Sequence, residues 1–254
     1  MNRSVERCVA GGLPDWAGDC VRAGRYRVAA RFRRSVLLVD GGGRACFAVN
    51  RGIGCGPLNL TMEDPLGWAG EAEEVCVGRR WLAGARRWDS RMPMGTDAAA
   101  VRRALEEGLE GVAPAESLAS VFTGRPAGAW ERRRDAVFRA ALERGATGDL
   151  EGMARAVKGC GQGLTPSGDD FLAGAMLGLR LLGRGGQRRI LRAALGGNVV
   201  SNAFLRVAAR GRVNEAVQTW LAEPSDSARL ARAAAFGHTS GADLLCGVLW
   251  GLRR

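Results

Sequence analysis

The sequence predicts an α+β protein, with a β-rich N-terminal domain at 1–95 and an all-helical C-terminal domain at 96–254. Apolar residues alternate with a period of two in much of the first part, and from Thr96 they follow the helical period. Two similar stretches of the C-terminal part indicate an internal repeat. We therefore expect a small barrel or sandwich-like sheet packed on a helical domain.

A β-hairpin is the clearest element of the N-terminal part, because two apolar runs flank Gly41-Gly42-Gly43. Strands are predicted at 28–32, 35–40, 44–49, 58–62 and 73–78. Residues 1–24 carry little pattern. Helices are predicted at 97–110, 130–144, 150–158, 188–195, 199–210, 213–222 and 227–236, with Thr96 as the cap of the first.

The chain is organised around a glycine-rich loop that turns into an apolar helix at 161–172. Pro166 places the helix start after it, and Ser167 with Asp170 has the spacing of a capping box. The stretch from His238 repeats the pattern 73 residues later, and Ser240, Gly241 and Asp243 match Ser167, Gly168 and Asp170.

Each copy also carries two glycines four residues apart, Gly174 with Gly178 and Gly247 with Gly251. Residues at this spacing share one helix face. A helix-interior glycine costs about 1 kcal/mol relative to alanine, so we expect a compensating close contact between the two helices.

The two helix starts have a structural and a functional interpretation. Capping alone explains the Ser and Asp side chains, whereas free amides at Gly168 and Gly241 would attract an anion. Asp169 aligns with Ala242 of the second copy, so capping does not require a carboxylate at this position. It either complements the helix dipole, binds Mg²⁺ with Asp170, or acts as a general base or amide acceptor.

Other candidates surround these motifs. His238 is the only histidine, and it either transfers a proton or orders the helix start. The remaining substrate-binding candidates are Gly163, Thr165, Thr239, Asn198 and Ser201, together with Gly54, Gly56 and Asn59 in the loop before the 58–62 strand. That loop is either a tight connection or an amide-lined anion pocket. Cys160 is interpreted as a small buried thiol.

The strings GQGLTPSGDDFLAG and GHTSGADLLCG resemble the two hallmark motifs of the AllH family, and GCGPLN at 54–59 is similar to its N-terminal motif. Asn198-Val199 departs from the Thr/Ser-rich helix entry that is common in the family. The resemblance implies a subunit of an oxamate carbamoyltransferase of purine (allantoin) degradation. Its activity would be carbamoyl transfer between an oxalurate-like compound and phosphate, with Asp169, Asp170, His238 and Asp243 as catalytic residues. The resemblance also implies partner subunits or a homo-oligomer.

Composition narrows the class of protein. The formal net charge is +11 and Lys158 is the only lysine, which favours anionic partners. The arginines are scattered, no groove-reading motif accompanies them, and Arg132-Arg133-Arg134 is expected on a solvated face, so nucleic-acid binding is disfavoured. Seven cysteines without a C-x-x-C pair fit a reducing cytoplasm. No run is long enough to span a membrane.

Three functions therefore remain open. The first is a carbamoyltransferase-like enzyme or subunit that binds a small anionic substrate, with no certain cofactor beyond a possible Mg²⁺. The second is a non-catalytic scaffold subunit, and the third is an anion or nucleic-acid binding module.

Overall fold

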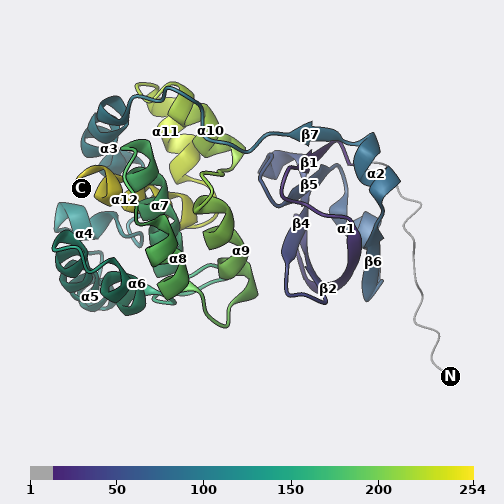
Figure 1. The fold of residues 1–254 in the computed structure, drawn as a ribbon, viewed down its shortest axis with the longest axis horizontal. Coiled ribbons are helices and arrows are strands. Elements are labelled where there is room, and N and C mark those ends of the chain that lie inside the picture. Colours follow the sequence, from purple (N-terminus) through teal and green to yellow (C-terminus); the bar gives the residue numbers. More distant parts are fainter. Residues whose placement is uncertain (1–13) are drawn as a thin grey trace. The chain divides into compact units, whose positions relative to one another are not determined.

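The computed structural model describes residues 14–254 (Figure 1). The weakly patterned residues 1–13, including Cys8, lie outside that range. Two compact units are present. The first holds the described residues up to Arg91 with Val213–Glu215, and the second holds Met92–Arg212 with Ala216–Arg254. A strand-rich and a helical unit confirm the predicted α+β class.

The first unit is a seven-stranded sheet that curls into a half-barrel, with the order β6-β2-β3-β4-β5-β1-β7. Its strands are β1 (Trp16–Gly18), β2 (Gly24–Phe32), β3 (Ser35–Asp40), β4 (Ala45–Asn50), β5 (Asn59–Met62), β6 (Glu74–Val77) and β7 (Arg86–Trp88). Neighbours are antiparallel except β4 with β5 and β1 with β7. The five predicted strands correspond to β2–β6, and the three-residue strands β1 and β7 were not predicted.

The core of this unit forms on one face of the sheet. Val36, Leu38, Ala48 and Leu60 alternate along β3, β4 and β5 and are fully excluded from solvent. The short helices α1 (Pro65–Ala69) and α2 (Arg79–Gly84) add a stacked pair of indole rings to the unit, Trp68 and Trp81, with centroids 5.6 Å apart.

The second unit is helical. Its elements are α3 (Ala98–Val112), α4 (Ala119–Thr123), α5 (Ala129–Ala146), α6 (Leu150–Val157), α7 (Ser167–Leu181), α8 (Gln187–Ala194), α9 (Val199–Ala208), α10 (Glu215–Ala222), α11 (Ser227–Ala234) and α12 (Ser240–Leu252). All predicted helices are present. The predicted cap of α3 is wrong, because the Asp97 carboxylate accepts the Ala99 and Ala100 N–H groups while the Thr96 hydroxyl donates to the Pro93 carbonyl.

Helices α7 and α12 form the centre of this unit and confirm the predicted glycine contact (Figure 1). A Cβ atom on Gly174 would lie 1.8 Å from the Leu244 carbonyl oxygen, and one on Gly247 would lie 2.0 Å from the Phe171 carbonyl oxygen. Further along, Gly178 and Gly251 meet at their Cα atoms. Contacts advance in the same direction on both helices, so α7 and α12 run parallel with their N-termini together.

Within residues 14–254, no helix combines the length and the apolar character that crossing a membrane requires.

Candidate functional site

The N-termini of α7 and α12 meet at the hydroxyl groups of the two motifs. The Thr165 Oγ1 atom lies 3.1 Å from the Ser240 Oγ atom, although the residues are 75 positions apart. The duplicated motifs therefore converge on one place in the fold, as the parallel glycine contact requires.

The serines and aspartates of the two copies pair crosswise. Asp170 accepts the Thr165 hydroxyl at 3.0 Å and is hydrogen-bonded to Ser240 of the other copy. Asp243 in turn faces Ser167 of the first copy and Thr239 of its own. Each motif's aspartate thus lies beside the other motif's serine.

This crosswise pairing shows that the predicted capping boxes are wrong. The N-cap positions of α7 and α12 are Pro166 and Thr239, and neither makes a side-chain cap hydrogen bond. Ser167 and Ser240 are already the first helical residues. The close glycine contact brings the two helix starts so near that the Thr165 and Ser240 hydroxyls bond across the helix pair.

Both aspartates of the pair are buried, with Asp170 at 8% and Asp243 at 0% exposure. Burial raises the pKa of Asp170 well above its usual value, and the neighbouring Asp243 and Asp169 charges raise it further. Burial likewise raises the pKa of Asp243, against the effect of the Leu118 amide. A carboxyl with a raised pKa keeps its proton to a higher pH than an ordinary aspartate, and while protonated it can donate a hydrogen bond or a proton.

The buried ion pair of Arg134 with Asp135 lies next to the segment whose amide bonds to Asp243. The Asp243 Oδ1 atom accepts the Leu118 N–H at 2.7 Å, and its Oδ2 atom has no hydrogen-bond partner among the described residues. Arg134 holds the segment that carries Leu118, because it donates to the Ser117 carbonyl at 2.8 Å and pairs with Asp135 at 2.9 Å. The expectation that Arg134 lies on a solvated face is therefore wrong, since it is 7% exposed.

The amides of Gly168 and Gly241 are bonded within the chain, so the expectation that they are free for an anion is wrong. Gly168 N–H donates to the Cys160 carbonyl at 2.8 Å, and Gly241 N–H donates to the Phe236 carbonyl at 2.9 Å. Cβ atoms at these glycines would lie 1.7 Å and 2.1 Å from backbone carbonyl oxygens of α6 and α11. The glycines allow each long helix to start against the preceding helix.

Asp169 is buried and bonds to the loop before α7. Its Oδ1 atom accepts the Gly159 N–H at 2.8 Å. Cys160 is partly exposed, so the expectation of a buried thiol is wrong, but burial and then the Asp169 charge raise its pKa, which agrees with an unactivated cysteine.

The Asp169 and Asp170 carboxylates each bond to a different group, the Gly159 amide and the Thr165 hydroxyl. Residues 14–254 contain no group of three or more His, Cys, Asp or Glu side chains that could hold a metal ion.

The other candidates of the helical unit lie around this centre. His238 is exposed and, in the described chain, has no hydrogen bond or ion pair. Asn198 caps α9 by accepting the Val200 and Ser201 amides at 3.0 Å, and its Nδ2 atom donates to the Leu164 carbonyl at 3.0 Å. It therefore ties α9 to the glycine-rich loop.

Two of these candidates differ in exposure. Ser201 is buried, and its hydroxyl has no partner in the described part of the chain. Gly163 is exposed in the loop at φ +95°, a conformation that favours glycine.

Gly54, Gly56 and Asn59 belong to the first unit, where they form a tight loop before β5. Asn59 Nδ2 donates to the Gly54 carbonyl at 3.1 Å. The Cys55 N–H donates to the Glu215 carboxylate at 2.8 Å. This loop amide thus already binds a carboxylate of the chain itself.

The repeat also includes the helix before each motif, which the sequence did not reveal. Both α6 and α11 have eight residues, and Asp149 and Asp226 accept amides at their N-termini. Gly161 and Gly237, both at positive φ, lie against Ser167 and Ser240, but the second loop is four residues shorter. The paired aspartate caps were the available signal, and the change in loop length concealed it.

Fold and site together define an α+β protein built around a duplicated helix–loop–helix with crosswise Ser–Asp pairs. The family model described as oxamate carbamoyltransferase subunit AllH matches residues 157–252, which contain both motifs. This match confirms the resemblance noted in the sequence over the part of the chain that holds both motifs. Comparisons with characterised proteins and with solved structures gave no match.

Proposed function

We propose that this protein is a carbamoyltransferase subunit that binds a small carbamoyl- or phosphate-bearing anion beside the paired N-termini of α7 and α12. The observation that carries the proposal is the pair of buried carboxyls, Asp170 and Asp243, at the convergence of the two motifs. The family description, which names a subunit of oxamate carbamoyltransferase, supports the reaction class and the need for other protein subunits. We place the reaction in the cytoplasm, as a step of purine catabolism.

The proposed reaction moves a carbamoyl group between an oxalurate-like compound and phosphate. A phosphate oxygen bonds to the carbamoyl carbon, the carbon–nitrogen bond to oxamate breaks, and the oxamate nitrogen gains a proton. A carboxyl with a raised pKa suits this step, because it keeps its proton to a higher pH than an ordinary aspartate and the leaving nitrogen requires a proton. Thr165 and Ser240 are at the surface side of the pair, where their hydroxyls suit hydrogen bonding to a carbamoyl group.

Asp169 and His238 have different proposed roles. Asp169 positions the glycine-rich loop through Gly159. His238 is exposed and next to Thr239, which suits proton exchange with solvent or binding of a substrate carboxylate. The formal charge of +11 favours approach of anionic substrates.

The test is carbamoyl transfer by the protein reconstituted with its partner subunits, measured as oxalurate formed from oxamate and carbamoyl phosphate. Asp170→Asn should lower kcat by about 10²–10⁴-fold if its proton is transferred. Asp226→Asn is the matched control, because asparagine also caps helices and α11 should keep its start. His238→Ala and Asp169→Asn should each lower activity. Full activity in all three site variants would refute the enzymatic role.

A scaffold subunit without catalytic groups is the second candidate. The bonded amides of Gly168 and Gly241 favour it, because they show that part of each motif locks helices together. In that case Asp170→Asn would change the stability of the assembly and leave kcat unchanged.

A further inference from the structure

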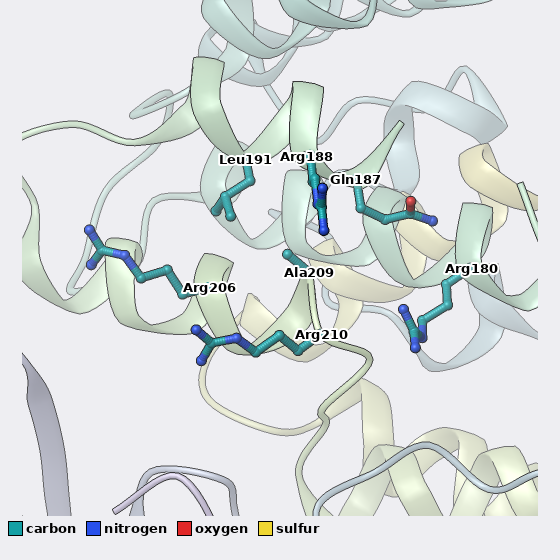
Figure 2. Close-up of a pocket in the computed structure, with 7 residues that line it drawn as sticks. All are labelled: Arg180, Gln187, Arg188, Leu191, Arg206, Ala209 and Arg210. Carbon is teal, nitrogen blue, oxygen red and sulfur yellow. The ribbon is translucent and has the colours of Figure 1, made fainter. Parts of the chain in front are cut away.

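A second polar site lies in the helical unit, in a cleft of about 490 Å³ lined by residues of α7, α8, α9 and the turn after α9 (Figure 2). Its lining is Arg180, Gln187, Arg188, Leu191, Arg206, Ala209 and Arg210. Four of these seven residues are arginines and none is acidic. The residues of the crosswise Ser–Asp site are not part of this lining, so the cleft is separate from the proposed catalytic pair.

The four arginines of the cleft have no counter-charge in the described part of the chain. All four are exposed, and none forms an ion pair there. Arg189, the neighbour of Arg188 in α8, shows the contrast, because it donates to Glu151 at 2.7 Å. Like charges that line one cleft, such as Arg206 and Arg210, repel each other. A bound anion would remove this repulsion.

Arg180 packs closely against a glycine beside the cleft. The Cα of Gly211 lies so close that a Cβ there would come within 2.4 Å of the Arg180 Nε atom, and its φ of +72° also favours glycine. Figure 2 shows the Arg180, Arg206 and Arg210 side chains reaching from different backbone positions along the cleft. The arginines therefore come from separate elements and present a distributed set of guanidinium groups.

The ligand that fits this arrangement is a small molecule with two or more phosphate groups. Planar guanidinium groups bind phosphate oxygens through paired hydrogen bonds, and several arginines match several phosphates. The volume lies within the usual range of small-molecule sites, roughly 300–1,000 Å³. Leu191 and Ala209 add apolar surface for the non-phosphate part of a ligand.

We propose that the cleft between α7, α8 and α9 is a binding site for a multiply phosphorylated small molecule, distinct from the Ser–Asp site. Its occupancy is independent of the carbamoyl reaction, so the proposal stands or falls separately from the proposed function.

Titration calorimetry of the full chain with inorganic tripolyphosphate, and separately with ATP, tests this proposal. Arg188→Glu combined with Arg206→Glu should weaken binding at least about 100-fold, since each lost charged hydrogen-bond pair is worth about tenfold or more. Arg192→Glu makes the same kind of charge change at an exposed α8 position outside the lining and should leave the affinity within about twofold. Unchanged melting temperatures would show that all variants fold.

Three results would overturn the proposal: no tripolyphosphate or ATP binding to the unaltered chain at millimolar concentration, an equal loss of affinity in Arg192→Glu, or an unchanged affinity in the double variant. Binding of a single-stranded oligonucleotide at least tenfold tighter than ATP would also overturn it, in favour of a nucleic-acid surface. A second double variant, Arg188→Gln with Arg206→Gln, removes the two positive charges without adding negative ones. It should also weaken tripolyphosphate binding, which would exclude repulsion by the new glutamates as the cause.

Discussion

Replacing Gly174 by alanine should force the two long helices apart. A Cβ at this position would lie 1.8 Å from the Leu244 carbonyl oxygen and 2.9 Å from the Val248 amide nitrogen. An ordinary contact begins at 3.4 Å, so the helices must separate locally by about 1.6 Å. The obstructing atoms are backbone, which cannot rotate away as a side chain can.

Two opposing contributions determine how much Gly174→Ala changes the free energy of unfolding. Overpacking a well-packed core costs up to about 3 kcal/mol, and replacing a helix-interior glycine by alanine returns about 1 kcal/mol. Gly174→Ala should therefore lower the free energy of unfolding by about 2 kcal/mol, which corresponds to a fall in Tm of roughly 4–8 °C for a chain of this size. Urea titration followed by far-UV circular dichroism measures it.

Gly111 provides the matched control. It is exposed near the end of α3, and a Cβ there would meet nothing within 4 Å. Gly111→Ala should therefore raise stability by up to about 1 kcal/mol. If Gly174→Ala matched it in sign and size, the close parallel contact between α7 and α12 would be wrong.

Two further variants test the buried polar groups. Because burial raises the folded-state pKa of Asp170 above the ordinary 3.8, the native state holds that proton more tightly, and the free energy of unfolding should fall as pH rises from about 4 toward neutrality. Asp170→Asn should flatten this dependence in urea titrations from pH 4 to pH 7, and an unaltered slope would contradict the raised pKa. Arg134→Met should cost up to about 3–5 kcal/mol, because it leaves the buried charge of Asp135 with only the longer ion pair to Arg139 at 3.9 Å. Adding Asp135→Leu should recover most of that loss, whereas an equally unstable double variant would show that Arg134 acts through its bonds to Ser117 alone.

Much of the fold followed from local patterns. Period-two alternation located β2–β6, and the four-residue glycine spacing predicted the α7–α12 contact. The strands β1 and β7 have three residues each, which is too short for alternation to show. Their pairing depends on distant backbone, such as Trp16 opposite both Thr61 and Arg86.

The candidate site was located by the repeat, but its hydrogen bonds were not. An S-x-x-D spacing describes contacts within one helix. It does not indicate that a second helix will lie close enough for its serine to contact the aspartate of the first. Arg134 was misplaced for a similar reason, because a run of arginines on a helix gives no indication which one turns inward. The arginine cleft combines residues from α7, α8, α9 and the turn after α9, whose proximity only the tertiary structure shows.

The exchange of serine and aspartate between the copies means that neither half is self-sufficient. A fragment ending before α11 would retain Asp170 and Ser167 but lose Ser240 and Asp243. The face of α7 that carries Gly174 and Gly178 would then be exposed to water. Both halves must therefore be present before either acquires its polar contacts, so the duplicated segment folds as a single cooperative element.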